Sequence, residues 1–290
     1  MLLQRKSCIG FTLAAVCLSI GCNTNASLHP IKVNGRYGYI NKSGKLAINP
    51  QFDDVGKFAE GLAPVKIGDR WGYVDTQGKL AINPQFDVAD PFSDGLALVG
   101  TGYRYGYIDK TGKIVINPQF DGAGHFSDGL APVRVADRWG FIDKESKLAI
   151  NPQFEEAGDF TEGLALVRVG DRFGYIDKSG KLAIQPQFES GGEFSDGLAL
   201  VSLGGKYGYV DRSGKLVITP QFEDAGEFSD GLALAGIGNR VGYIDKQGKF
   251  AINPIFDRGG DFEQGLAPVW VGGRQGYINK TGRFVWTPTA

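Results

Sequence analysis

Cysteine and histidine are scarce in this 290-residue sequence, which holds only Cys8, Cys17, Cys22, His29 and His125. All three cysteines lie near the amino terminus, so the rest of the chain has neither a disulfide nor a cysteine metal site available. The two histidines stand at unrelated places in the pattern described below, which predicts surface positions for both rather than catalysis. Motifs of serine hydrolases, zinc proteases and P-loop proteins are also missing. The sequence therefore predicts no catalytic residues, no metal site and no bound cofactor.

An excess of positive charge is missing as well. The chain has 31 lysines and arginines against 32 aspartates and glutamates, a formal net charge of -1. Loss of an amino-terminal leader containing Arg5 and Lys6 would leave a charge of about -3. Proteins that bind nucleic acid usually carry a basic patch. The composition therefore predicts that nucleic acid is not a partner.

The hydrophobic run from Cys8 to Ile20 is too short to span a bilayer as a helix. Because it follows two basic residues, it is typical of a bacterial secretory signal. The run ends in "LSIGC", which resembles the lipobox of bacterial lipoproteins, although Ser19 stands where that pattern prefers leucine. The resemblance implies that Cys22 is lipidated and becomes the first residue of the mature chain.

Three parts of the chain follow from this interpretation. They are a signal peptide over residues 1–21, a short linker over residues 22–27 and a repeat domain over residues 28–290. Cleavage after Ala26, without a lipid, remains the alternative. In both cases we expect the protein to be exported to the periplasm or the cell surface, and lipidation would anchor it to a membrane.

A repeat with a constant period fills the rest of the sequence. The glycine of a "GY" or "GF" pair recurs every 34 residues, without insertion or deletion, at Gly38, Gly72, Gly106, Gly140, Gly174, Gly208, Gly242 and Gly276. A period of this size indicates units that each bury an apolar face against their neighbours. We therefore expect eight copies of one structural module.

Residues 62–95 represent one unit. Alternating apolar residues and tight-turn signals predict three antiparallel strands over 62–67, 70–75 and 79–83, with the third strand ending at Pro84. The second strand contains a glycine, and because glycine has no side chain, a neighbouring ring or backbone can approach it closely. The fold class predicted is all-β, built from tandem three-stranded meanders.

The connection between units contains two phenylalanines, Phe86 and Phe92 in this copy, and has room for a short fourth strand at "QF". Both phenylalanines recur in all seven connections, from Phe52 to Phe256 and from Phe58 to Phe262. Each buried ring contributes about 1.5 to 3 kcal/mol. We expect these rings to pack between successive units.

The turns carry their own signals. A turn aspartate, Asp75 in this copy, becomes Asn41 and Asn279 in the terminal units. Asparagine makes the same turn hydrogen bond without a charge, so a turn role is favoured over calcium binding.

The phrases "DRWGYVDTQGKLAINPQFD" and "FSDGLALV" together resemble the bacterial WG repeat, also called the KWG repeat. The resemblance extends from about Leu28 to the end of the sequence. It implies a repeat architecture and says little about activity. Four residues depart from the pattern: Ser146 at a turn glycine, Val241 and Gln275 at the aromatic position, and Ile255 at a glutamine.

Two architectures suit eight such units. Eight blades lie within the range of a closed β-propeller, and the sequence favours this propeller-like ring. The last unit ends at "FVWTPTA" without the connection that the other units have. An open β-solenoid of stacked meanders therefore remains the alternative.

One variable position in the first strand of each unit is a candidate binding surface. It carries Lys32, Lys66, Arg134, Arg168 and Trp270, with glycine or serine in the other copies. The column is either an ordinary solvated strand face or a surface that contacts an acidic glycan, a peptide or another protein. The function predicted is a non-enzymatic binding or scaffolding module at the cell envelope, with an envelope protein, peptide or glycan as partner. A carbohydrate-active or other enzyme built on a β-propeller is the alternative.

Overall fold

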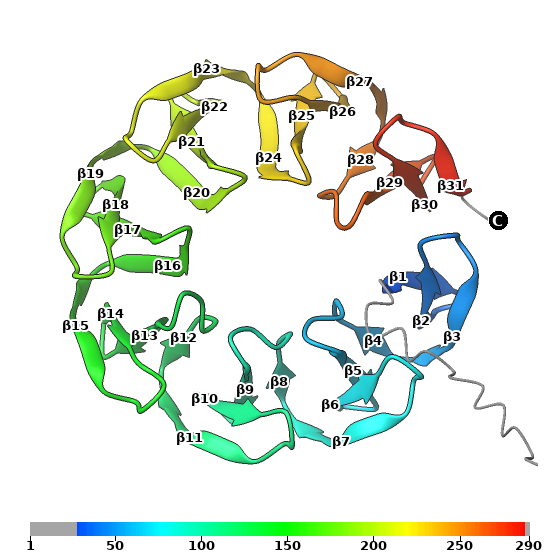
Figure 1. Ribbon diagram of the computed structural model, residues 1–290, viewed down its shortest axis with the longest axis horizontal. Helices are drawn as coiled ribbons and strands as arrows, with labels where there is room; N and C mark the ends of the chain where they lie inside the picture. The colour runs from blue at the N-terminus through cyan, green and yellow to red at the C-terminus, as the bar shows by residue number, and fades with distance from the viewer. Residues whose placement is uncertain (1–27, 288–290) are drawn as a thin grey trace, which may run out of the picture.

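Eight small antiparallel sheets are arranged as a ring around a central opening (Figure 1). This computed structural model describes residues 28–287, and within that range every regular element is a β-strand. The closed ring confirms the prediction of a propeller, and an open β-solenoid is not supported. Cys22, the predicted signal peptide and the predicted linker lie outside the described residues.

Each sheet is one blade, numbered here from 1 to 8 in chain order, and its strands lie side by side in order from the central opening to the outer edge. Blade 1 contains β1 (Leu28–Val33), β2 (Arg36–Asn41) and β3 (Leu46–Phe52). The inner strands of blades 2 to 8 are β4 (Asp54–Val55), β8 (Val88–Ala89), β12 (Gly122–Ala123), β16 (Glu156–Thr161), β20 (Ser190–Ser195), β24 (Asp224–Ser229) and β28 (Arg258–Gly259).

The second strands of blades 2 to 8 are β5 (Leu62–Ile67), β9 (Leu96–Thr101), β13 (Ala131–Val135), β17 (Leu164–Val169), β21 (Leu198–Leu203), β25 (Leu232–Ile237) and β29 (Leu266–Val271). The third strands are β6 (Arg70–Asp75), β10 (Arg104–Asp109), β14 (Arg138–Ile142), β18 (Arg172–Asp177), β22 (Lys206–Asp211), β26 (Arg240–Ile244) and β30 (Arg274–Asn279). The outer strands are β7 (Leu80–Phe86), β11 (Ile114–Phe120), β15 (Leu148–Phe154), β19 (Leu182–Phe188), β23 (Leu216–Phe222), β27 (Phe250–Phe256) and β31 (Phe284–Trp286).

The outer strand is longer than the sequence predicted. In blade 2 it continues through Pro84 to Phe86, whereas the predicted strand ended at the proline. Proline is tolerated because β7 is an edge strand, where its missing N–H takes no bond away from a neighbour. The short extra strand follows Phe86 at Val88–Ala89, rather than at "QF", and pairs with β9 of the next blade. The chain thus crosses from the outer edge of one blade to the inner edge of the next.

A bulge in the outer strand explains the glycine of each "GY" pair. Between two paired positions, β6 advances from Trp71 to Tyr73 while β7 advances from Phe86 to Ile82, so β7 carries two extra residues. A Cβ atom on Gly72 would lie 2.4 Å from the carbonyl oxygen of Ile82. The predicted close approach is confirmed, and the neighbour that comes close is backbone.

The turn between the third and outer strands is built by its first residue. The Asp75 carboxylate accepts hydrogen bonds from the backbone N–H groups of Gln77 and Lys79, at 3.0 and 2.9 Å. In blade 1 the amide oxygen of Asn41 accepts the equivalent two bonds, both at 3.0 Å. Because a neutral side chain makes the same bonds, this geometry supports the turn role of the aspartates.

Ser146 occupies the one such turn without glycine, and its φ is 63°. The equivalent glycines have φ values between 75° and 85°, a region that costs a residue with a side chain about 1 kcal/mol. We expect Ser146→Gly to raise the free energy of unfolding by up to about that amount in chemical denaturation. Ser146→Ala keeps the Cβ atom and should give no gain. A gain of the same size in both variants would contradict the strain.

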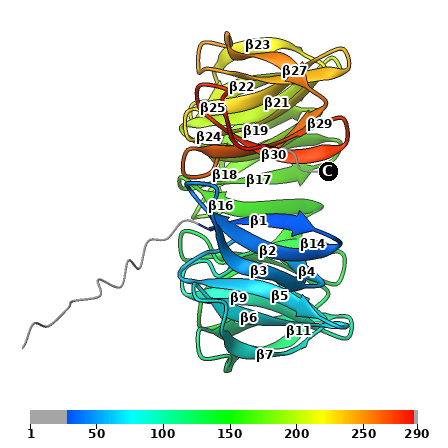
Figure 2. The same cartoon turned by 90° about the vertical axis from the view of Figure 1, so that its right-hand side faces the viewer.

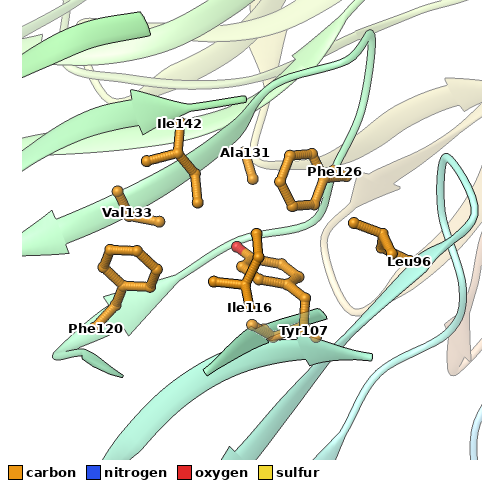
Figure 3. Packing of buried hydrophobic residues seen from close by; sticks show 9 residues of the cluster. Leu96, Tyr107, Ile116, Phe120, Phe126, Ala131, Val133 and Ile142 are labelled. Atoms are coloured by element: carbon orange, nitrogen blue, oxygen red, sulfur yellow. The ribbon is translucent and has the colours of Figure 1, made fainter. Parts of the chain in front are cut away.

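The phenylalanines pack between blades. Rings of the first column are at most 8% exposed, and rings of the second column are at most 2% exposed except for half-buried Phe58. Figure 3 shows one such cluster, in which Tyr107 and Phe120 of blade 3 face Phe126 and Val133 of blade 4. Each cluster draws side chains from two successive blades, which confirms the predicted packing.

Repeated polar residues also join successive blades. In the phrase "DGLA", Asp94 and Gly95 both have positive φ, and the Asp94 carboxylate accepts the backbone N–H of Gly129 in the next blade, at 2.8 Å. The carboxylate of Asp87 accepts the N–H of Gly102 in blade 3, at 2.7 Å, and also pairs with the Arg70 guanidinium of blade 2. The residues that recur most strictly are therefore occupied in holding the ring together.

Candidate functional site

Seven of the eight blade junctions share one arrangement, in which an inner segment lies between two blades. We use "inner segment" for residues 53–61 and the equivalent residues of later blades. At the first junction the Tyr39 hydroxyl donates to the carbonyl of Gly56, at 2.8 Å, and the Phe58 ring packs against the Tyr39 ring with centroids 4.7 Å apart. The N–H of Gly56 donates to the carbonyl of Pro64, at 2.8 Å. The inner segment thus links both blades.

The junction between blades 8 and 1 differs. Within residues 28–287, β1 pairs with β2 alone, so blade 8 meets β1 directly. The Tyr277 hydroxyl of β30 donates to the carbonyl of Pro30, at 2.9 Å. Pro30 is the counterpart of Pro64, whose carbonyl accepts a backbone N–H of an inner segment. At this junction a side chain has taken the acceptor that a main chain uses elsewhere.

His29 marks the same exception. The equivalent residue is alanine in every other blade: Ala63, Ala97, Ala131, Ala165, Ala199, Ala233 and Ala267. His29 is only 4% exposed, and its ring centroid lies 5.6 Å from that of Tyr277, where the other blades place a phenylalanine. The predicted surface position is wrong because this side chain fills the junction, and burial lowers the pKa of its imidazole.

Apolar contacts and one ion pair complete the ring. Ile31 of β1 belongs to one buried cluster with Leu266 and Tyr277 of blade 8. Lys57 and Glu263 form an ion pair across the junction, at 3.1 Å. Figure 2 looks onto this junction, with β30 of blade 8 next to β1.

A pocket of about 340 Å³ opens at this junction. Its lining includes His29, Pro30, Trp270, Gln275 and Tyr277, and its exposed surface is mainly apolar. Pockets of this size, with apolar walls and a few polar groups, are the usual form of ligand sites. The pocket is therefore our candidate functional site.

Trp270 lies in this pocket because blade 8 reverses a cross-strand pair. In blade 2, Lys66 of β5 lies opposite Trp71 of β6, whereas in blade 8 Trp270 of β29 lies opposite Gln275 of β30. The indole thereby moves to the strand next to the inner segment, and the Arg258 guanidinium lies 5.4 Å from its ring centroid. This exchange creates an aromatic wall that the other blades lack at this position.

The other predicted surface residues do not share the pocket. Lys32 lies on β1 with its ammonium 4.8 Å from the Tyr37 ring centroid. Arg168 pairs with Glu156 of its own blade, at 2.9 Å, and Arg134 and Lys66 occupy the same register position on blades 4 and 2. The structure thus places two of the five residues, Lys32 and Trp270, on the blades that form the junction, and the other three elsewhere on the ring.

An acidic arc leads from the pocket around the central opening. It consists of the residues that precede the second phenylalanine in blades 5 to 8: Asp159, Glu193, Glu227 and Asp261. The Glu193 carboxylate accepts the N–H of Asp159, at 3.2 Å, and the Glu227 carboxylate accepts the N–H of Glu193, at 2.8 Å. Asp261 also lines the pocket. The arc joins inner segments that border the opening (Figure 1).

Burial shifts the protonation of the arc. The pKa of Glu193 rises to about 7, first because the carboxyl is buried and then because Asp159 and Glu227 lie close to it. Burial also raises the pKa of Glu227 and of Asp261. At the end of the arc, hydrogen bonds to Asp159 and Asp90 raise the pKa of His125 to about 10. His125 is thus a partly exposed cation at the inner rim, paired with Asp159 and Asp90.

Glu193→Gln is expected to remove a destabilising charge. Between the ordinary glutamate pKa and a pKa of about 7 the folded chain binds a proton that the unfolded chain has released, so stability falls as pH rises through that window. The amide keeps the acceptor for the Asp159 N–H. We expect the variant to be about 2 kcal/mol more stable than wild type at high pH, and the difference to vanish in acid.

Denaturation at a series of pH values measures this effect. Glu145→Gln changes an exposed glutamate in a turn and should leave the pH profile of stability as it is. If the Glu193→Gln and wild-type profiles ran parallel at all pH values, burial of that charge would not be the cause.

No group of three or more histidine, cysteine, aspartate or glutamate side chains within residues 28–287 has an arrangement that could hold a metal ion. The same stretch of chain contains no helix with the length and hydropathy needed to cross a membrane.

The sequence did contain a signal for this site. His29 is the one departure from alanine in its column, and Trp270 stands where no other copy has an aromatic residue. Neither exception could be assigned to a junction, because that requires knowing that the first and last blades meet.

Solved structures with the same fold include the dihydro-heme d1 dehydrogenase NirN, with a TM-score of 0.60, 13% identity and coverage of 90% of this chain and 72% of NirN. A eukaryotic initiation factor has a TM-score of 0.58 and 12% identity, over 91% and 85% of the two chains. PorZ, a surface component of the type-IX secretion system of Porphyromonas gingivalis, has a TM-score of 0.49 and 10% identity over 82% of this chain, which spans 38% of PorZ. At such low identities, the matches to NirN and the initiation factor show a shared fold alone.

A search of curated proteins finds no match to this sequence. The family described as "WG containing repeat" matches it seven times, over residues 37–71, 71–104, 105–139, 139–172, 173–207, 207–240 and 242–274. These segments cover most of the ring and coincide with the structural period. The chain belongs to the WG containing repeat family.

Proposed function

We propose that this protein is a non-enzymatic binding module that holds an envelope protein, peptide or glycan at the bacterial cell envelope. The observation that carries the proposal is the junction pocket of about 340 Å³. Seven equivalent junctions contain an inner segment, and the eighth offers an apolar concavity walled by Trp270 and Tyr277. Aromatic side chains in a pocket are the usual anchors of a bound partner.

Most of the repeated residues have structural roles, which supports a binding function over catalysis. Glycines, tyrosines, phenylalanines and carboxylates of the repeat make the contacts that join the blades. Two titratable groups of the junction, Lys57 and Glu263, form the ion pair across the ring closure. His29 is buried against Tyr277. A rigid frame with a recess at its one irregular junction suits a scaffold that presents a binding site.

Cross-linking from inside the pocket tests this proposal. A photoreactive phenylalanine derivative placed at Gln275 is compatible with the fold, because six of the eight blades have an aromatic residue in that column. We expect it to form a specific adduct in cell-envelope extract, identified by mass spectrometry. The matched control carries the same group at Leu148, which is 51% exposed on the outer strand of blade 4. Identical adducts from both positions, or none from position 275, would contradict a site in the pocket.

The envelope location rests on the leader sequence. The apolar run before Cys22 and the "LSIGC" ending support export and lipid attachment. We expect a fatty-acid analogue to label the wild-type chain and not Cys22→Ser, because only the cysteine thiol can receive the lipid. Label of equal strength in the two chains, or label in neither, would remove the lipid anchor from the proposal.

A further inference from the structure

We propose that β1 binds an extended segment of a partner polypeptide as an added inner strand of blade 1. The segment would carry, in order, an acidic residue, a small residue, a glycine, any residue and a phenylalanine. This inference rests on the proposed binding function and specifies the chemistry of the partner. Addition of a strand to an exposed sheet edge is a recurring mode of peptide recognition, in which main-chain bonds provide affinity and side-chain pockets provide specificity.

The protein itself contains seven segments that occupy the position proposed for the partner. At each filled junction an inner segment lies where the partner would bind in blade 1, and the five residues read DVGKF, VADPF, GAGHF, EAGDF, SGGEF, DAGEF and RGGDF. Phenylalanine ends every copy, and glycine stands third in six of the seven copies. Because the junctions share one geometry, these segments define what an eighth junction would accept.

The edge of β1 has the acceptors for such a strand. In blade 2 the N–H groups of Asp53 and Gly56 donate to the carbonyls of Lys66 and Pro64, at 3.0 and 2.8 Å. The counterparts of those carbonyls on β1 belong to Lys32 and Pro30. Within the described residues β1 has a strand neighbour on one side only. Its other edge is therefore a template for pairing.

When the partner segment binds, the Tyr277 hydroxyl would change its hydrogen-bond acceptor, and no hydrogen bond would be lost. The incoming glycine N–H would take the Pro30 carbonyl, which now accepts from the Tyr277 hydroxyl at 2.9 Å. The hydroxyl would then donate to a carbonyl of the segment, as Tyr243 does to Gly260 at 2.9 Å. The hydrogen bond from Tyr277 to Pro30 thus replaces two bonds of the other junctions, one donated to an inner segment by a tyrosine and one donated by an inner-segment N–H.

The phenylalanine of the segment has a defined place. At the other junctions the ring packs on a tyrosine or phenylalanine, with centroids 4.7 to 5.0 Å apart. At the eighth junction the tyrosine is Tyr277, and the His29 ring lies over it at 5.6 Å. His29 must yield that place, so replacing it with the alanine of the other blades should favour binding.

Charge selects the first residue of the segment. Lys32 is exposed on β1 at the register position of Lys66, which lies opposite Asp54, and of Arg168, which forms an ion pair with Glu156 at 2.9 Å. A lysine at this edge favours an acidic residue on the added strand. Three of the internal copies, DVGKF, EAGDF and DAGEF, already combine an acidic first residue with the terminal phenylalanine.

The sequence that precedes β1 does not carry this motif. The 34-residue register aligns residues 20–24, which read "IGCNT", with the internal copies. Ile20 stands at the acidic position and Thr24 at the phenylalanine. These residues lack both side chains that the junction would recognise. We therefore assign the strand to a different polypeptide.

A labelled synthetic peptide with the sequence of residues 223–231, EDAGEFSDG, tests the inference. Fluorescence anisotropy with the full-length protein should show saturable binding, and a peptide with alanine in place of Phe228 should not bind. His29→Ala should tighten binding about fivefold, since it removes the competing ring. Lys32→Glu should weaken binding about tenfold, and a peptide with lysine at the position of Asp224 should restore it. The matched control, Lys66→Glu, changes the same position on blade 2 and should bind as wild type does.

Three results would overturn the inference. These are equal binding of the alanine peptide, equal loss with Lys32→Glu and Lys66→Glu, and binding that arises only after residues 22–27 are deleted, which would make the occupant a segment of the same chain. If the peptide fails to bind while cross-linking from position 275 succeeds, the inference is wrong and the proposed function stands. If both experiments fail, both proposals are wrong.

Discussion

Gly208→Ala is expected to destabilise the protein by about 4 kcal/mol, which makes it one of the most damaging single-methyl additions that the fold offers. A Cβ atom at this position would lie 2.5 Å from the carbonyl oxygen of Ile218 and 2.6 Å from the backbone nitrogen of Pro220. Both atoms belong to the bulge of β23, where four residues lie opposite two of β22. Because backbone cannot yield as a flexible side chain does, the bulge itself must shift.

Thermal and chemical denaturation of the variant measure this cost, and we expect the midpoint temperature to fall by about 10 °C. The control is Gly158→Ala in β16, where the nearest atom to an added Cβ is 3.6 Å away. That variant should lie within about 1 kcal/mol of wild type. Similar losses in the two variants would mean that glycine as a strand residue, rather than the close approach, sets the stability.

Phe154→Ala is expected to cost about 3 to 5 kcal/mol. Phe154 ends β15, is 5% exposed, and packs with Phe141 of its own blade and with Phe160 and Val167 of blade 5. Its removal would leave a cavity between two blades that are each held by the chain on both sides, so the walls have little freedom to collapse. We therefore expect the free energy of unfolding to fall both by the lost burial of the ring and by the cost of the cavity that it leaves.

Urea denaturation tests this prediction against Leu148→Ala, which removes an apolar side chain from the same strand at a site 51% exposed. The leucine variant should change the free energy of unfolding by less than about 1 kcal/mol. An unchanged midpoint for Phe154→Ala would show that the ring makes no contribution between blades. The phenylalanine columns would then have to be considered as a binding surface.

The two substitutions also bear on the candidate site. The repeated glycines hold the outer strand close within each blade, and the repeated phenylalanines pack between successive blades. Both belong to the frame that ends at the junction of blades 8 and 1. Tyr277 and His29 bridge it with side chains. Gly208 belongs to blade 6, two blades before blade 8 in the chain. Its substitution should therefore lower stability without changing the residues that line the pocket.

The sequence by itself determined the period, the family and the three main strands of each unit. Those features depend on contacts within a unit or with the next unit, and such contacts recur in every copy. One repeat was enough to predict the close approach at Gly72, the turn at Asp75 and the burial of Phe154. Local turn chemistry and the alternation of apolar residues indicate these features directly.

Only the tertiary structure decided that the inner strand belongs to the following blade, that the outer strand passes through Pro84, and that the ring closes. Closure joins Tyr277 to Pro30, 247 residues apart, at the two ends where the repeat is least regular. No periodic pattern can encode a contact that occurs once. The roles of His29, Lys32 and Trp270 follow from that single contact. The sequence shows that these residues depart from the repeat, but only the structure, which brings the first blade against the last, explains why.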